Sequence, residues 1–264
     1  MLFSILGPLQ IQNNDQVFTI ERAPVRTTLL SLLIDEGKPV NTSTLLRRMW
    51  DDPTYSATNN LRLHISRLRN QLSSIDPCLS NRISTVRGSE GEAGGYHLRT
   101  CPEEIDFTRF KMLANKGFQE LRTGHPAQAS AFFAQALSLW RGPIGQGCRI
   151  SNEVRIKFDA LEQLQLASQE GQIESLLSLG QSTELLPEIL AILDTDPHRE
   201  KSWVNLIRAY YLSGNITKSL EAFKTATETF KNSLGLDPSP EINRIHISVL
   251  KRDSNAVRYF GVGD

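Results

Sequence analysis

From Asp106 onward, the sequence is a succession of helical patterns separated by short breaks of Gly, Pro and Asn. Apolar residues recur there every three or four positions, the spacing of an amphipathic helix. The expected helices cover residues 106–122, 126–140, 153–179, 182–194, 199–213, 216–234 and 239–252. Because 39% of the chain is hydrophobic and 22% is charged, such helices can bury a core of ordinary size. We therefore predict that this part of the chain is all-α.

The helical part also contains an internal repeat of about 34 residues, the period of tetratricopeptide repeats. Such a repeat places small residues where two helices approach and large residues where they interlock. The best copy contains Trp203, Leu206, Tyr210, Phe223 and Ala226; an earlier copy contains Gly117, Ala129, Phe133 and Ala136; a poorer one contains Leu185, Ile189 and Ile192, followed by Pro197. The alternative is a plain helical bundle.

The first hundred residues follow a different order: a sheet, three helices and a hairpin. Short apolar and β-branched segments between turn residues predict a small antiparallel sheet at the start. The expected elements are strands at residues 2–6, 9–12 and 17–20, helices beginning near Pro24, at Asn41 or Thr42 and at Ser56, and strands at 82–87 and 96–99. The first helix is expected to end at Gly37 and the third near Ser73.

The third of these helices has one apolar side and one polar side without acids. At about 100° per residue, its residues separate into a buried stripe, an opposite face and two edges. The buried stripe contains Leu61, Ile65, Leu68 and Leu72, and the opposite face contains Asn59, Leu63, Ser66, Arg67 and Asn70. Of the two edges between them, one contains Arg62 and Arg69 and the other contains Asn60 and His64. Folding alone gives Leu63 no use on a polar face, whereas in a major groove an aliphatic group can contact a thymine methyl and Arg can reach guanine. The alternative is a solvated basic helix.

A basic helix that follows two short helices and precedes a β-hairpin is in winged-helix order. In that arrangement the long helix enters the major groove, and the hairpin, or wing, reaches phosphates or the minor groove. Thr85 and Arg87 are two residues apart on the expected wing strand, so they share a face.

Two motifs resemble those of OmpR/PhoB-type winged helices. One is L-H-I-S-R-L-R at residues 63–69, followed by Leu72; the other is T-V-R-G at 85–88, with G-Y at 95–96. The resemblance implies that Leu63 and Arg67 face bases, Asn60 and Arg69 face phosphates, Thr85 touches the backbone and Arg87 enters the minor groove. With the remaining polar-face residues, the predicted DNA-contacting set is Asn59, Asn60, Arg62, Leu63, Ser66, Arg67, Arg69, Thr85 and Arg87. Arg62 stands where that group often has Asp, and residues 89–94 lengthen the wing with two acids, which favours a tip bent away from DNA.

Four further motifs resemble the Streptomyces antibiotic regulatory protein (SARP) family. They are L-G-P-L at residues 6–9, G-K-P-V at 37–40, A-L-S-L-W-R-G-P at 136–143 and L-G-L-D-P-S-P-E at 234–241, and the last two resemble signatures of the bacterial transcriptional activator domain. The resemblance implies an OmpR/PhoB-type winged-helix DNA-binding domain at residues 1–100, a tetratricopeptide-like activator domain at 104–252 and a C-terminal tail at 253–264. We thus expect a mainly α fold, with an α+β winged helix-turn-helix before an all-α repeat domain.

The same resemblance implies a sequence-specific transcriptional activator of a biosynthetic, secondary-metabolite gene cluster. Such proteins bind direct repeats of double-stranded DNA near promoters as homodimers and recruit RNA polymerase through a sigma factor or another subunit.

Other classes of function have little support in the sequence. It contains no H-E-x-x-H, G-x-S-x-G or phosphate-binding-loop motif, so we expect no enzyme and no cofactor. The three cysteines are far apart, which argues against a disulfide framework or a paired-cysteine metal site. No apolar run is long enough to cross a bilayer and the start does not resemble a signal peptide, so we expect a cytoplasmic protein.

Two alternatives remain open. Because 29 basic and 29 acidic residues give a formal net charge of zero, the chain is not basic overall as nucleic-acid binders usually are. The helical part could therefore be a tetratricopeptide-type module that binds a peptide or protein, with the winged helix as a second protein contact. A weaker idea is that the helical part senses a small molecule, although no polar cluster in the sequence points to one.

Overall fold

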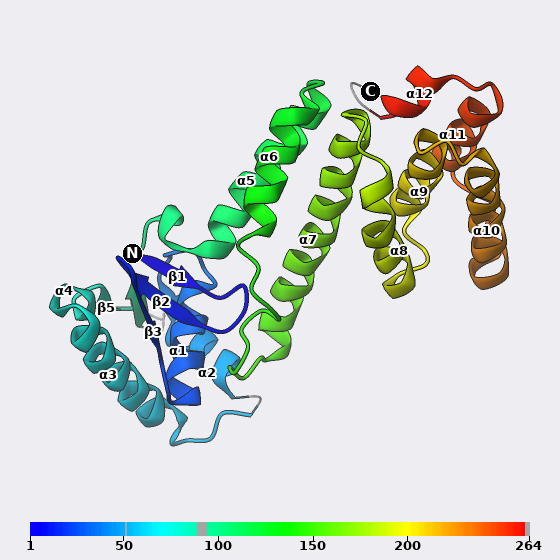
Figure 1. The fold of residues 1–264 in the computed structure, drawn as a ribbon. Coiled ribbons are helices and arrows are strands. Elements are labelled where there is room, and N and C mark those ends of the chain that lie inside the picture. The colour runs from blue at the N-terminus through cyan, green and yellow to red at the C-terminus, as the bar shows by residue number, and fades with distance from the viewer. Residues whose placement is uncertain (51, 89–93, 262–264) are drawn as a thin grey trace. The chain divides into compact units, whose positions relative to one another are not determined.

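A computed structural model describes residues 1–50, 52–88 and 94–261. It divides into two compact units, one of residues 1–112 and 138–163 and the other of residues 113–137 and 164–264. The first unit contains both small sheets, and the second is helical (Figure 1). The predicted mainly α fold, with strands confined to the N-terminal part, is confirmed. The predicted domain boundaries were drawn from sequence motifs, whereas these units are defined by contacts in space. The boundaries therefore stay a prediction.

The first sheet lies where the alternating apolar pattern predicts it. Its strands, in spatial order, are β1 (Leu2–Ser4), β2 (Gln10–Asn13) and β3 (Gln16–Thr19), all antiparallel. The register pairs Phe3 with Ile11 and Ile11 with Phe18, so apolar side chains meet on one face. Phe3 and Ile11 are fully buried there.

Three helices, a fourth that is only one turn long, and a second sheet complete the winged-helix arrangement of the first unit. The elements are α1 (Ala23–Leu33), β4 (Val40–Asn41), α2 (Thr42–Met49), α3 (Ala57–Ile75), α4 (Pro77–Ser80), β5 (Ile83–Val86) and β6 (Gly95–Leu98). Asn41 caps α2, because its Oδ1 accepts a hydrogen bond from the Thr44 amide at 2.8 Å. The expected end of α1 at Gly37 is wrong by four residues: the helix stops at Leu33, and Gly37 lies in the following turn with φ +75°. Neither β4 nor α4 is apparent from the sequence pattern.

Two of the sequence signatures meet in the first unit. The amides of Arg141 and Gly145 donate hydrogen bonds to the carbonyls of Leu6 and Ile5, at 2.7 and 2.9 Å. The backbone at Gly7 passes so close to Arg141 that an added Cβ would lie 3.0 Å from the Arg141 Cβ. The L-G-P-L and L-W-R-G-P segments are therefore two sides of one packing contact.

Asp106 adds a buried carboxylate to the same region. Its oxygens accept hydrogen bonds from the amides of Ile5 and Leu6 at 2.8 and 2.9 Å. Burial raises the pKa of Asp106, although these amides and the nearby Arg141 guanidinium act in the opposite direction. The start of the chain is thus held by groups more than a hundred residues away.

The helices predicted from Asp106 onward are present with small shifts of their ends. They are α5 (Asp106–Arg122), α6 (Pro126–Leu137), α7 (Asn152–Ser178), α8 (Leu186–Thr195), α9 (Glu200–Leu212), α10 (Ile216–Leu234) and α11 (Pro240–Leu250). The short helix η2 (Thr183–Leu185) forms the start of the helix expected over 182–194, whereas η1 (Pro102–Glu104) and α12 (Ser254–Arg258) are not among the predicted helices. The helix expected over 126–140 ends at Leu137, because the following signature is used for the contact with Leu6. Among the described residues, no helix is long and apolar enough to cross a membrane.

Small residues of the predicted repeat lie where helices of the second unit approach most closely. A Cβ added to Gly117 or Gly171 would fall 2.7 or 2.6 Å from the ring of Phe133. Phe133 is fully buried and packs edge-on against Phe118. The absence of a side chain at Gly117 therefore leaves room for the Phe133 ring, which explains the pattern of small and large residues around 117–136.

The L-G-L-D-P-S-P-E signature connects α10 to α11. Gly235 ends α10 in the left-handed conformation with φ +69°, and its amide bonds to the Lys231 carbonyl at 3.1 Å. Ser239 begins α11 as its N-cap, with Pro240 in the first turn. The signature thus specifies one helix end and one helix start.

Buried polar side chains of α7 and α9 are joined by hydrogen bonds beside the apolar core of the second unit. Glu170 receives hydrogen bonds from Arg199 at 2.7 Å and from the Ser202 hydroxyl at 2.6 Å. Arg208 is 1% exposed and donates hydrogen bonds to the carbonyls of Val257 and Arg258, at 3.0 and 2.6 Å. The predicted tail therefore begins with a short helix, α12, that is anchored to the unit through a buried guanidinium.

Candidate nucleic-acid interface

Helix α3 is fixed by its apolar stripe and leaves its polar face uncovered. Leu61, Ile65, Leu68 and Leu72 are at most 1% exposed, and they pack in the core of the first unit with α1 and α2. The helical periodicity of the sequence therefore predicts the buried side of α3 correctly. Each such side chain contributes about 1.5–3 kcal/mol when fully buried, which holds the opposite face in a defined orientation.

The opposite face carries the side chains predicted to contact DNA. Asn59, Asn60, Arg62, Leu63 and Ser66 are exposed, and Arg67 is half-buried. Leu63 is 46% exposed, which places an aliphatic group among polar ones on the surface. Because α3 contains no acid, nothing on the helix itself opposes a phosphate backbone.

Two basic side chains of this face have defined surroundings. The Arg62 guanidinium donates a hydrogen bond to Asn59 Oδ1 at 3.3 Å, one turn earlier. Arg67 lines a shallow hollow of about 350 Å³ together with Arg22, from the start of α1, and Asn70. Arg22 was not among the residues predicted from the sequence; its position beside the helix depends on the tertiary fold.

His64 lies at the margin between the core and the polar face. Its ring stacks on Trp50 with centroids 6.1 Å apart. Burial lowers the pKa of His64, and the positive charge of Arg67 lowers it further. The ring of His64 thus packs on an indole at the margin of the core.

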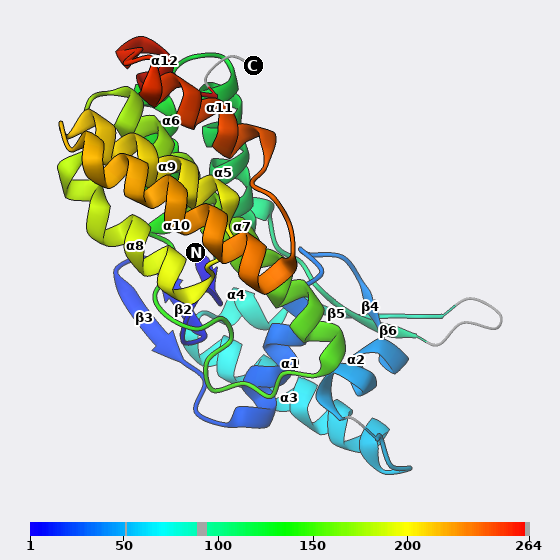
Figure 2. The same ribbon diagram turned by 90° about the vertical axis from the view of Figure 1, so that its right-hand side faces the viewer.

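The wing is the β5–β6 hairpin of a three-stranded sheet with spatial order β4, β6, β5. Figure 2 shows β5 and β6 side by side and extending away from the helices of the unit. Thr85 on β5 and Arg87 just after it are exposed, as predicted. The bent tip expected from the two acids lies in residues 89–93, outside the described residues.

Gly95 fixes the wing to the body of the unit. A Cβ at this position would lie 2.1 Å from the Val40 carbonyl oxygen, a separation that no real side chain allows. The glycine of the G-Y motif therefore lets β6 approach β4, and it sets the root of the wing.

Arg69 makes contacts within the unit that the resemblance does not include. Its guanidinium donates two hydrogen bonds to the Ile83 carbonyl, from Nε at 3.2 Å and from Nη2 at 3.0 Å. A third, longer bond of 3.4 Å reaches Thr85 Oγ1. The side chain expected to face a phosphate thus joins α3 to the wing strand.

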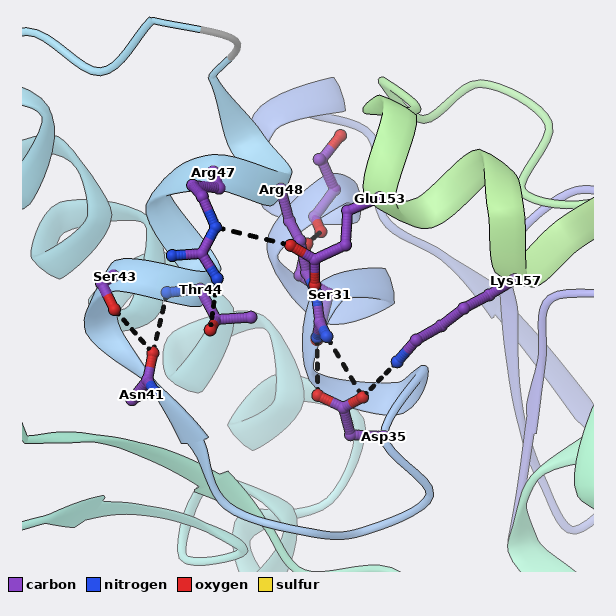
Figure 3. A network of polar contacts seen from close by, with 10 residues as sticks. Ser31, Asp35, Asn41, Ser43, Thr44, Arg47, Arg48, Glu153 and Lys157 are labelled. Carbon is purple, nitrogen blue, oxygen red and sulfur yellow. Dashed lines mark hydrogen bonds and ion pairs between the residues drawn. The ribbon is translucent and has the colours of Figure 1, made fainter.

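A buried ionic network holds α2, the helix before α3. Figure 3 shows Arg48 between Asp35 and Glu153: its guanidinium bonds to Asp35 at 2.7 and 3.1 Å and to Glu153 at 2.9 Å. Lys157 of α7 also binds Asp35, at 2.5 Å. Burial raises the pKa of Asp35, but the hydrogen bonds and charges of Arg48 and Lys157 outweigh it and hold this pKa below its ordinary value. Arg48 was not predicted from the sequence. It could have been found as a basic residue three positions after Leu45, on the buried side of an amphipathic helix, where a cation needs an acidic partner.

The described residues offer little else for chemistry. No group of three or more His, Cys, Asp or Glu side chains within residues 1–50, 52–88 and 94–261 could hold a metal ion. Burial raises the pKa of the Cys148 thiol to about 11, which keeps this sulfur protonated and unreactive at neutral pH.

Comparison with known proteins gives two family matches that divide the chain. Residues 19–91 match the family described as transcriptional regulatory protein, C terminal, and residues 105–250 match the bacterial transcriptional activator domain. The regulatory protein DnrI of Streptomyces peucetius is 31% identical, covering 96% of this chain and 93% of DnrI. The transcriptional regulator RedD of Streptomyces coelicolor is 27% identical, covering 95% of this chain and 70% of RedD.

A solved structure has a similar fold. Mycobacterium tuberculosis EmbR, in complex with a low-affinity phosphopeptide, superposes with a TM-score of 0.84 at 25% identity over 97% of this chain and 68% of that one. In sequence, the transcriptional regulatory protein EmbR is 28% identical, and the chain spans 63% of its length.

Proposed function

The chain belongs to the SARP family of transcriptional regulators, with an OmpR/PhoB-type winged helix and a bacterial transcriptional activator domain, and we propose that it activates a biosynthetic gene cluster. In this proposal, α3 enters the major groove of double-stranded DNA and the wing contacts the backbone beside it. The observation that carries it is the acid-free face of α3, where Arg67 and Leu63 stand next to each other above a fully buried stripe.

The individual contacts follow from the chemistry of that face. Arg67 is suited to a guanine edge, and Leu63 to a thymine methyl. The exposed amides Asn59 and Asn60, with Arg62 and Ser66, are suited to phosphates and base edges at the rim of the groove. Thr85 contacts the backbone, and Arg87 enters the minor groove, where Arg is favoured when the groove is narrow.

The remaining parts of the proposal concern assembly. We propose that the protein binds direct repeats as a homodimer on DNA, and that the helical part contacts RNA polymerase through a sigma factor or another subunit. It acts in the cytoplasm and has no catalytic role or cofactor. The proposal is supported by the family match of residues 105–250 to an activator domain.

The test is selection of bound fragments from the genome of the source organism. The wild-type chain is compared with Arg67→Ala and with Arg155→Ala, a control that removes a 53% exposed guanidinium from α7. We expect enrichment of a direct repeat spaced by about one helical turn. Arg67→Ala should lose about 1–3 kcal/mol and relax the selected sequence, whereas the control should select the same repeat.

Two results would count against the proposal. If folded wild-type protein enriches no sequence, the DNA-binding function fails, and the protein-interaction module becomes the better hypothesis. If Arg67→Ala selects the same repeat with unchanged affinity, the docking of α3 is wrong even though DNA is bound.

A further inference from the structure

The Arg69 side chain begins on the recognition helix and ends on the wing. The Nε and Nη2 groups of its guanidinium both donate to the Ile83 carbonyl oxygen, at 3.2 and 3.0 Å, so one oxygen accepts two hydrogen bonds. Arg69 is half-buried, so the contact is partly shielded from water. It is the contact that joins the two structures proposed to bind DNA, and its consequence goes beyond the family match.

The position of Ile83 explains why this bond matters. Strand β5 lies at the edge of its sheet, with β6 on one side only. The Arg82 carbonyl accepts from the Arg99 amide on the β6 side at 2.9 Å, so the next carbonyl, that of Ile83, points to the open edge. An edge carbonyl without a neighbouring strand needs another donor, and Arg69 provides two.

The third bond reaches one of the predicted DNA contacts. Arg69 Nη2 donates to Thr85 Oγ1 at 3.4 Å, so the Thr85 hydroxyl is an acceptor in this pair. Its own hydrogen is then available to donate outward, toward a phosphate oxygen. Arg69 therefore favours the hydroxyl orientation that backbone binding needs.

We propose that Arg69 is a positioning residue that sets the wing relative to α3, so that Thr85 and Arg87 meet the DNA when α3 occupies the major groove. This inference rests on the proposed function. It differs from the direct phosphate contact that the resemblance implies, because the Nε and Nη2 donors of Arg69 are already engaged within the protein.

The two roles of Arg69 differ in how a lysine replaces it. Lys keeps the positive charge but cannot make a planar fork on one carbonyl while reaching Thr85. If Arg69 contacts a phosphate, Arg69→Lys retains most of the affinity. If Arg69 positions the wing, Arg69→Lys loses affinity and also makes the wing residue Arg87 less effective.

The experiment is a double-mutant cycle with Arg69→Lys and Arg87→Ala on a mixed-sequence 30-bp duplex at low salt. We expect each single variant to weaken binding about 3- to 10-fold and the double variant to be little worse than Arg87→Ala alone. Arg62→Lys, an exposed substitution on the same helix, is the matched control and should leave the effect of Arg87→Ala unchanged.

Hydrogen exchange of the free protein gives a second readout. Arg69→Lys should accelerate amide exchange in β5 and β6 and leave exchange in α1 unchanged, because only the wing loses the hydrogen bonds that hold it to α3. Additive effects in the cycle, or unchanged exchange in the wing, would overturn the positioning role even if DNA binding is intact. Failure of the wild type to bind any duplex would instead overturn the proposed function, and this inference with it.

Discussion

Removing the chain after Asp253 should destabilise the second unit through Arg208. In the intact protein the buried Arg208 guanidinium donates to the carbonyls of Val257 and Arg258. Burial lowers the pKa of Arg208 to about 10, although Glu174 acts in the opposite direction, so the group is still charged at neutral pH. The truncation deletes both carbonyls, so this guanidinium, 1% exposed in the intact protein, keeps only its longer bonds to Asn205 Oδ1 at 3.3 Å and Ser178 Oγ at 3.4 Å.

The expected loss has two parts. Removing the two shortest hydrogen-bond partners of a buried charge costs about 3–5 kcal/mol. Val257 is fully buried, and removing its side chain from the core costs roughly 1.5–3 kcal/mol more. Because whole domains are stable by only about 5–15 kcal/mol, the truncated unit should open frequently or unfold.

The assay is native-state hydrogen exchange of α9, which reports the second unit alone. The truncation is measured in the wild-type background and in Arg208→Met, where no buried charge is left behind. The cost of truncation should fall by most of the ionic part, about 3–5 kcal/mol, in the methionine background. An equal cost in both backgrounds would refute the reasoning, because the tail would then stabilise the unit through apolar contacts only.

Three further outcomes follow from the first unit. Replacing Gly95 with Ala should displace β6 from β4 and lower the thermal midpoint of unfolding, since the new Cβ would meet the Val40 carbonyl at 2.1 Å; Gly88→Ala, in the exposed part of the wing, is the milder control. In Asp35→Asn, acid should destabilise the protein less steeply than in the wild type. The lowered pKa of Asp35 means that the folded state binds fewer protons than the unfolded state, so its stabilisation is complete above about pH 4 and is lost as the pH falls further; parallel urea midpoints for both proteins below pH 4 would contradict this. Leu63→Ala should change the free energy of unfolding by no more than about 0.5 kcal/mol, because Leu63 is 46% exposed, and should reduce affinity for the selected repeat. A large loss of stability would show that Leu63 packs in the core instead.

The periodic parts of the structure were predictable because their signals are local. The buried stripe of α3 follows from helical spacing, and the caps around Gly235 and Ser239 follow from residues with strong conformational preferences. Gly117 of the repeat is also visible in the sequence, because it stands at the position where two helices approach, whereas Gly171 was not predicted.

The parts that could not be predicted depend on which distant segments meet. Strand β4 is only two residues long and exists because β6 returns beside it. Arg48 finds its partners 13 and 105 residues away, at Asp35 and Glu153. The turn of Arg69 toward Ile83 likewise requires the wing to be in place, so helical spacing could place the residue on an edge of α3 but could not predict this partner.

The close contact between the two sequence signatures also governs how this protein can be made. The first unit needs residues 138–163, because the Ile5 and Leu6 carbonyls find their donors at Gly145 and Arg141. During synthesis at about 5–20 residues per second, roughly 7 to 27 seconds pass between translation of the strands at the start of the chain and translation of those donors. A nascent chain of residues 1–100 therefore exposes unfinished backbone and apolar surface to the cell. A fragment cut at that point for expression should depend on chaperones or aggregate, whereas one extended through Gln163 carries the segments that complete the unit.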